Sequence, residues 1–95
     1  MFSIIIPIYN EEDNIIKLSE SILSSLSNLD YEVIFINDGS TDNSENRIEE
    51  LTKKYSNISL INLRRNYGQT AAMQAGFDHS NGDFVIPMDG DMQND

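Results

Sequence analysis

Four short runs of apolar residues divide the chain into blocks. Each run has the length of a strand and is rich in β-branched residues; the runs cover residues 2–8, 32–37, 58–63 and 83–88. Apolar positions within them are nearly continuous and do not alternate with polar ones, which is typical of strands covered on both faces. The pattern therefore predicts a mainly parallel sheet between two layers of helices.

Helical periodicity fills each interval between the apolar runs. Apolar side chains recur every three or four positions in residues 13–27 and 43–55, and the second segment carries charged residues on its opposite face. Residues 69–79 contain small side chains that suit a helix lying close against a sheet. The predicted fold is a Rossmann-like, three-layer α/β/α arrangement in the order βαβαβαβ. Because crossovers between parallel strands are right-handed, every loop leading from a strand into a helix lies at the carboxyl edge of the sheet.

Three turn positions carry more specific expectations. Gly39 is expected to adopt a positive φ in the turn after the second strand. Asp42 and Thr41 precede the second helical segment, and the side chain of one or the other is expected to cap the first turn of that helix. Asn81-Gly82 follows the third segment and is expected to provide a left-handed exit from the helix into the fourth strand.

Composition excludes several classes of protein. The 95 residues hold 6 Lys+Arg against 16 Asp+Glu, and the net charge of −10 argues against a nucleic-acid partner, because phosphate binding needs clustered basic side chains. Cysteine is absent, which excludes disulfides and thiolate metal sites and is compatible with a reducing, cytoplasmic compartment. No apolar run approaches the roughly 20 residues of a membrane span. The chain has room for one domain at most, and its composition does not indicate an oligomeric state.

The four strand exits carry the candidate chemistry, because ligands of such sheets bind beyond the carboxyl ends of the strands. Three exits are acidic, and the other contains the pair Arg64-Arg65. Asp89 and Asp91 are two positions apart, so in an extended chain both carboxylates face one side and can bind one Mg²⁺ or Mn²⁺ ion. Gln93 can add a carbonyl oxygen. The alternative is a solvated turn in which an Asp caps the next element.

The second exit, residues 38–42, also allows two interpretations. It can be only a turn between strand and helix, or Asp38 can accept hydrogen bonds from a base or ribose at the sheet edge. Two nucleotide-binding motifs are absent: the first exit contains no glycine for a dinucleotide fingerprint, and GxxxxGK[ST] does not occur. His79 ends the third helical segment, where a cation favours the helix dipole, and is interpreted as structural.

Taken together, the four exits resemble the motifs of family 2 glycosyltransferases of the GT-A fold, and the resemblance spans the whole chain. The segments that carry it are IPIYNEE (6–12), NDGSTD (37–42), RNYGQTAA (65–72), AGFDH (75–79) and MDGDMQ (88–93). The third exit is the most discriminating and is similar to dolichol-phosphate mannosyltransferases and bacterial polyprenyl-phosphate glycosyltransferases. Asn37 departs from the Asp usual in the family, and Gly90 departs from the usual Ala.

The resemblance implies roles for residues at all four exits. The residues implied in binding the nucleotide sugar are Pro7, Tyr9, Glu11, Asp38, Arg65 and Asp89. The residues implied in holding Mg²⁺ or Mn²⁺ are Asp89, Asp91 and Gln93. Within these sets, Asp38 would contact uracil or guanine, Arg65 would approach the phosphates, and Asp91 would take part in catalysis.

The implied reaction transfers a hexose from a UDP- or GDP-linked sugar, with inversion, to an acceptor that is expected to be a polyprenyl or dolichyl phosphate. The chain is expected to be the amino-terminal part of a larger catalytic domain, cytoplasmic or at the cytoplasmic face of a membrane. Two alternatives stay open: a nucleotide-binding piece without turnover, and a nucleotidyltransferase, whose first loop is usually glycine-rich and basic. A flavodoxin-like receiver domain is a more distant third.

Overall fold

The computed structural model describes residues 1–89, which form a four-stranded parallel sheet with helices on both faces. In chain order the elements are β1 (Phe2–Ile8), α1 (Ile15–Ser25), β2 (Tyr31–Asn37), α2 (Ser44–Lys54), β3 (Ile58–Asn62), α3 (Gln69–His79) and β4 (Phe84–Pro87). All the predicted elements occur in the predicted order, and their ends differ from the prediction by two residues at most. The predicted α/β fold is confirmed.

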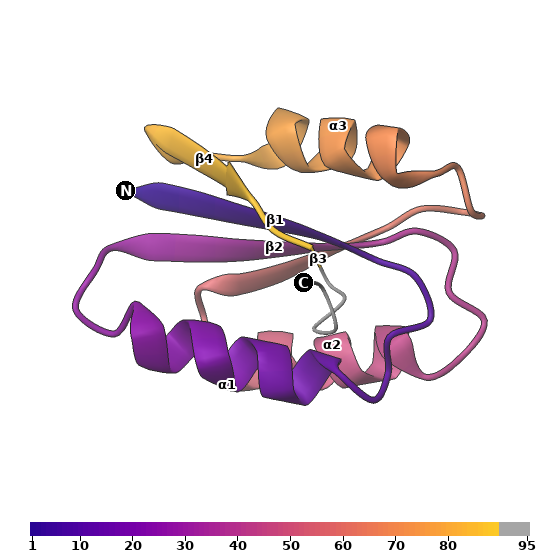
Figure 1. The fold of residues 1–95 in the computed structure, drawn as a ribbon, viewed down its shortest axis with the longest axis horizontal. Helices are drawn as coiled ribbons and strands as arrows, with labels where there is room; N and C mark the ends of the chain where they lie inside the picture. Colours follow the sequence, from indigo (N-terminus) through magenta and orange to yellow (C-terminus); the bar gives the residue numbers. More distant parts are fainter. Residues whose placement is uncertain (90–95) are drawn as a thin grey trace.

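The strands lie in the order β3-β2-β1-β4, so the direction of strand addition reverses at β1. β1 pairs with β2 along its whole length, from Phe2 opposite Tyr31 to Ile8 opposite Asn37, and with β4 on its other side. The loops that leave β1, β2 and β3 gather at one end of the sheet (Figure 1). A reversal of strand order is where open α/β sheets form a crevice for ligands.

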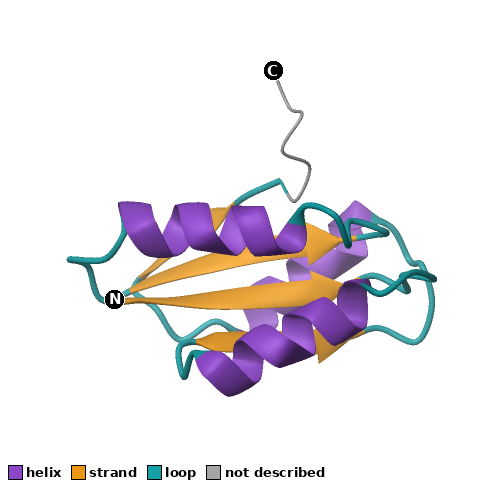
Figure 2. Ribbon diagram, turned by 90° about the horizontal axis from the view of Figure 1, so that it is seen from below, coloured by secondary structure: helices purple, strands orange, loops and turns teal. Residues whose placement is uncertain are grey.

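Helices α1 and α2 cover one face of the sheet, and α3 covers the other (Figures 1 and 2). The larger core cluster lies under α1 and α2 and includes Ile4, Ile6 and Ile8 of β1, whereas Ile5 packs with Ala72 of α3 on the opposite face. This division explains the continuous apolar runs, because alternate residues of each central strand enter different halves of the core.

Helix α3 approaches the sheet closely, as its small residues predict. A Cβ on Gly76 would lie 2.9 Å from Ile36 Cδ1 and 3.0 Å from Ile5 Cβ. A larger side chain at this position would therefore push α3 off the sheet.

None of the helices within residues 1–89 combines the length and the apolar character of a membrane span.

The turn predictions have mixed outcomes. Gly39 has a φ of +74°, as predicted, but Asn81-Gly82 is not a left-handed exit: positive φ within residues 1–89 occurs only at Asn10, Gly39 and Gly68. Gly82 is instead required by close approach, because a Cβ there would lie 2.6 Å from Ser3 Oγ.

The predicted cap of α2 is present one position earlier than the formal helix cap. Asn43 is the N-cap residue and makes no capping hydrogen bond with its side chain. Asp42 Oδ1 accepts the Ser44 N–H at 2.9 Å, so the carboxylate still satisfies a donor in the first turn.

Candidate functional site

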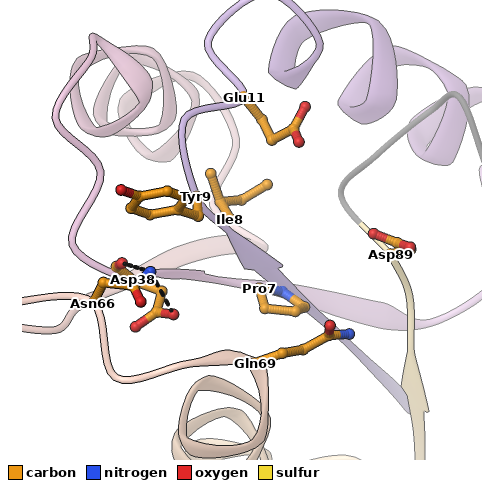
Figure 3. A pocket seen from close by; sticks show the side chains of 8 residues that line it. All are labelled: Pro7, Ile8, Tyr9, Glu11, Asp38, Asn66, Gln69 and Asp89. Atoms are coloured by element: carbon orange, nitrogen blue, oxygen red, sulfur yellow. Dashed lines mark hydrogen bonds between the residues drawn. The ribbon is translucent and has the colours of Figure 1, made fainter.

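A pocket opens at the carboxyl edge of the sheet, beside the point where the strand order reverses (Figure 3). Its lining comes from all four strand exits and consists of Pro7, Ile8, Tyr9, Glu11, Asp38, Asn66, Gln69 and Asp89. Five of the residues selected from the sequence are in this set: Pro7, Tyr9, Glu11, Asp38 and Asp89. The fold thus brings together side chains that are up to 82 positions apart, from Pro7 to Asp89.

The first exit supplies an aromatic ring and a carboxylate. Tyr9 is 47% exposed, so its ring is available to pack against a planar group such as a base. The Glu11 carboxylate accepts a hydrogen bond from Asn14 Nδ2 at 2.8 Å, and its backbone carbonyl accepts the Asn14 N–H at 2.9 Å. These bonds tie Glu11 to the start of α1 and give its side chain a defined position.

Asp38 bonds to the loop between β3 and α3, a contact that the sequence does not predict. It is only 4% exposed and follows β2 directly, so its carboxylate faces the loop between β3 and α3. It accepts the N–H groups of Tyr67 at 2.8 Å and Gly68 at 3.0 Å, and the Asn66 amide at 3.2 Å. Because an ionised carboxylate offers about four acceptor positions, this loop contact is compatible with one further donor from the pocket.

Gly39 allows the loops after β2 and β3 to touch. A Cβ at this residue would lie 2.3 Å from the Asn66 backbone nitrogen and 2.4 Å from the Arg65 carbonyl carbon. With its positive φ, the position is therefore restricted to glycine by both conformation and space.

Three lining residues, Ile8, Asn66 and Gln69, were not selected from the sequence, and one selected residue lies outside the lining. Asn66 and Gln69 line the pocket, and the only signal for them is their place in the motif of the third exit. Arg65 is not in the pocket lining; its guanidinium carbon lies 5.1 Å from the centre of the Tyr67 ring, in a cation–π contact. A phosphate contact for Arg65 stays a prediction.

Asn37 is buried and serves as a connector between strands. Its Nδ2 donates to Asn62 Oδ1 at 3.0 Å, and its Oδ1 accepts the Ser40 N–H at 3.1 Å. An aspartate at this position would lack the donor that Asn62 Oδ1 receives. The Asn that replaces the usual Asp thus has a side-chain partner within the sheet and is not itself part of the pocket lining.

The predicted metal ligands are only partly within the described residues. Asp89 lines the β4 side of the pocket, across Pro7 from Asp38 (Figure 3), whereas Asp91 and Gln93 lie outside the described residues. Along residues 1–89, no three acidic or histidine side chains come together in a way that could hold a metal ion. The Asp89 carboxylate fits Mg²⁺ or Mn²⁺ in its chemistry, but a complete donor set would depend on Asp91 and Gln93.

Comparisons with known proteins agree on the family. The family model described as Glycosyl transferase family 2 matches residues 3–95. A curated relative, undecaprenyl-phosphate 4-deoxy-4-formamido-L-arabinose transferase from Proteus mirabilis, is 44% identical over 95 residues, covering 97% of this chain and 29% of that protein. The chain spans less than a third of the length of the first curated relatives that it matches.

Solved structures share the fold. S. aureus TarS, residues 1–349, in complex with UDP superposes with a TM-score of 0.81 at 28% identity, over 95% of this chain and 27% of that one. Glucosyl-3-phosphoglycerate synthase from Mycobacterium tuberculosis, in complex with Mn²⁺, UDP and phosphoglyceric acid, has a TM-score of 0.77 at 26% identity, over 96% of this chain and 33% of that one.

Proposed function

The chain belongs to glycosyl transferase family 2, and from this premise we propose that it forms the donor-binding part of an enzyme that transfers a hexose from a UDP- or GDP-linked sugar. The pocket at the carboxyl edge carries the proposal. Five residues that the sequence associates with a nucleotide sugar line one pocket, at the place where α/β sheets bind their ligands.

Within this proposal, each part of the pocket has a chemical task. The Tyr9 ring packs against the base, and Asp38 accepts a hydrogen bond from a base N–H while it holds the Tyr67 and Gly68 amides. Related proteins support a nucleoside diphosphate as the ligand, since TarS was solved with UDP and glucosyl-3-phosphoglycerate synthase with UDP and Mn²⁺.

The proposed transfer inverts the anomeric carbon. The bond from that carbon to the diphosphate oxygen breaks as an acceptor oxygen attacks from the opposite face, and negative charge grows on the departing diphosphate. When Mg²⁺ or Mn²⁺ is bound by Asp89, Asp91 and Gln93, it supplies the neutralisation of that charge. Asp89 reaches the pocket from β4, on the side opposite Asp38 and Tyr9 (Figure 3).

The proposed acceptor is a polyprenyl or dolichyl phosphate, and the proposed location is the cytoplasmic face of a membrane. The support is the P. mirabilis relative, which is named as an undecaprenyl-phosphate transferase. A phosphate acceptor is already ionised near neutral pH, so its attack does not require a strong protein base.

Calorimetric titration of the protein with UDP and with GDP, each with and without Mn²⁺, tests the donor site. We expect one nucleotide to bind and Mn²⁺ to strengthen its binding, whereas Asp91→Ala loses the effect of Mn²⁺. Asp78→Ala is the matched control, because it removes an exposed carboxylate near the far end of α3. An Asp91→Ala variant that retained the full Mn²⁺ effect would contradict the metal assignment.

An assay of sugar transfer to a polyprenyl phosphate tests the reaction itself. Donor-dependent formation of a lipid-linked sugar is the expected result. Nucleotide binding without transfer to any lipid phosphate would contradict the acceptor and favour a binding function.

A further inference from the structure

The first strand exit is joined to the turn after β2 by hydrogen bonds that centre on Asn10. Its side-chain Oδ1 accepts the N–H of Thr41 at 2.8 Å and that of Asp42 at 3.3 Å. In the opposite direction, the Asn10 N–H donates to Ser40 Oγ at 2.9 Å. One residue thus binds three consecutive positions of the neighbouring turn.

The two residues after Asn10 extend the same connection. The Glu11 N–H donates to Ser44 Oγ at 2.9 Å, and the Glu12 N–H donates to Asp42 Oδ2 at 3.3 Å. The Glu12 carboxylate in turn accepts the Asn43 N–H at 3.2 Å. Three successive backbone donors of the first exit therefore bond to the β2–α2 turn and the first residue of α2.

Asn10 has a backbone conformation that few residues adopt. Its φ is +53°, and it is the sole residue other than glycine with a positive φ within residues 1–89. Asparagine tolerates this region better than most L-residues. In the sequence, Asn10 stands between two pocket residues, Tyr9 and Glu11, although Asn10 itself is not part of the lining.

We propose that Asn10 is a positioning residue of the nucleotide pocket. By holding the Thr41 and Asp42 amides, it fixes the left-handed turn of the first exit and with it the placement of the Tyr9 ring and the Glu11 carboxylate. Its effect on nucleotide affinity rests on the proposed function, whereas its effect on the turn does not.

Asparagine combines two properties that can be separated by substitution. Glycine at position 10 keeps the access to positive φ but removes the acceptor, and alanine removes both. Aspartate keeps an acceptor oxygen and much of the tolerance for positive φ. The series Asn10→Gly, Asn10→Ala and Asn10→Asp therefore distinguishes the side-chain bonds from the backbone conformation.

Two measurements test the inference: affinity for UDP and GDP by calorimetry, and hydrogen exchange of the Thr41 and Asp42 amides. In Asn10→Gly we expect both amides to exchange at least tenfold faster and nucleotide affinity to fall about tenfold, the effect of removing one or two hydrogen bonds. Asn10→Ala is expected to show a larger loss, and Asn10→Asp is expected to restore both properties to within about threefold of wild type.

Asn28→Gly is the matched control, because it makes the same change in the exposed turn between α1 and β2, at the opposite edge of the sheet. It is expected to leave both measurements unchanged. Exchange of the Thr41 and Asp42 amides at the wild-type rate in Asn10→Gly would overturn the inference. If Asn10→Gly and Asn10→Ala did not fold, Asn10→Asp would decide, and fast exchange of the two amides in that variant would overturn the inference. Absence of nucleotide binding by the wild type would refute the proposed function instead, while the exchange rates would still decide the role of Asn10.

Discussion

Hydrogen bonds to two carboxylates hold the two ends of helix α3. Both carboxylates belong to the β2 region: Glu32 lies near the start of β2, and Asp38 directly follows its end. At the entrance to α3, Asp38 accepts the N–H groups of Tyr67 and Gly68. At the exit, Glu32 Oε2 accepts the Asn81 N–H at 2.7 Å and a hydrogen bond from Ser3 Oγ. The two ends lie at opposite edges of the sheet (Figure 1).

The two carboxylates differ in their surroundings. Asp38 is almost fully buried and also lines the pocket at the carboxyl edge, whereas Glu32 is only partly buried and is not in the lining of that pocket. The same type of contact thus holds α3 at both edges, and at the carboxyl edge the carboxylate also lines the pocket that is proposed to bind the nucleotide. Substitutions at the carboxyl edge should therefore reduce both stability and nucleotide binding, whereas substitutions at the amino edge should reduce stability alone.

Gly39→Ala should have the largest effect, because it disrupts the carboxyl edge in two ways. Alanine is strained at a φ of +74°, and its Cβ would lie 2.3 Å from the Asn66 backbone nitrogen, which a side-chain movement cannot relieve. We expect the free energy of unfolding, measured with urea, to fall by about 3 kcal/mol or more.

Gly82→Ala is the counterpart at the amino edge. Its Cβ would lie 2.6 Å from Ser3 Oγ and 2.7 Å from the Ser3 nitrogen, but its φ is not positive. A smaller loss is expected, because the alanine at this position meets close contacts but adds no left-handed backbone strain. An equal or larger loss in Gly82→Ala would mean that the two edges are not distinguished in this way.

Asp38→Ala should reduce both stability and nucleotide binding. The substitution leaves the Tyr67 and Gly68 amides without their acceptor, whereas Asn66 Nδ2 keeps its bond to the backbone carbonyl of residue 38; the expected cost is about 2–4 kcal/mol in urea unfolding. Affinity for UDP or GDP should fall more than tenfold by calorimetry, since the loop that carries Asn66 and leads to Gln69 loses three hydrogen bonds to the Asp38 carboxylate. Unchanged affinity in a variant that stays folded would separate Asp38 from the pocket.

The sequence predicts the layers of this fold well because strand length and helical period are local properties. The apolar run 2–8 and the small residues of 69–79 specify their elements without reference to the rest of the chain. The exit of α3 was mispredicted for the opposite reason: Gly82 is required by Ser3, 79 positions away, and not by its own turn.

The site could be predicted only as far as the strand exits identify it. Parallel pairing brings Pro7, Asp38 and Asp89 to one edge; the position at a strand exit pointed to Asp38 and Asp89, whereas Pro7 was implied by the family resemblance. Which residues of a loop face the pocket depends on contacts between loops, such as the hydrogen bond that the Tyr67 N–H donates to the carboxylate of Asp38, 29 positions earlier. Asn66 is held by such contacts, and the sequence gives no signal for Asn66 or Gln69 beyond their place in the motif of the third exit.

Glu32→Ala should lower stability without changing nucleotide affinity. Loss of the bonds from Asn81 and Ser3 is expected to reduce the free energy of unfolding by about 1–2 kcal/mol. Glu20→Ala, which removes an exposed carboxylate from α1, is the control and should leave stability within about 0.5 kcal/mol of wild type. A loss of UDP or GDP binding in folded Glu32→Ala would show that the amino edge also influences the pocket.

The smallest expected effect is a pH dependence of stability that both edges share. Burial alone would raise the pKa of Glu32, but the hydrogen bonds from Ser3 and Asn81 outweigh burial and hold the pKa below its usual 4.5. Burial likewise opposes the lowered pKa of Asp42, where bonds from Ser44 and the Glu12 N–H prevail and the usual value is 3.8. One of these carboxylates lies at each edge of the sheet.

A carboxylate whose pKa is lower in the folded than in the unfolded protein stabilises the fold above its unfolded pKa, and this contribution is lost as the pH falls through the folded pKa. The free energy of unfolding should therefore decline as the pH falls below about 4.5, the usual value for Glu32. Glu32→Gln should flatten the upper part of this decline and Asp42→Asn the lower part, because Asp42 begins to titrate at a lower pH. Below pH 4.5, the free energy of unfolding of Glu32→Gln should change less with pH than that of the wild type. If both proteins showed the same slope, the bonds from Asn81 and Ser3 would not depend on the charge of Glu32. The contact at the amino edge would then differ in type from the contact at Asp38.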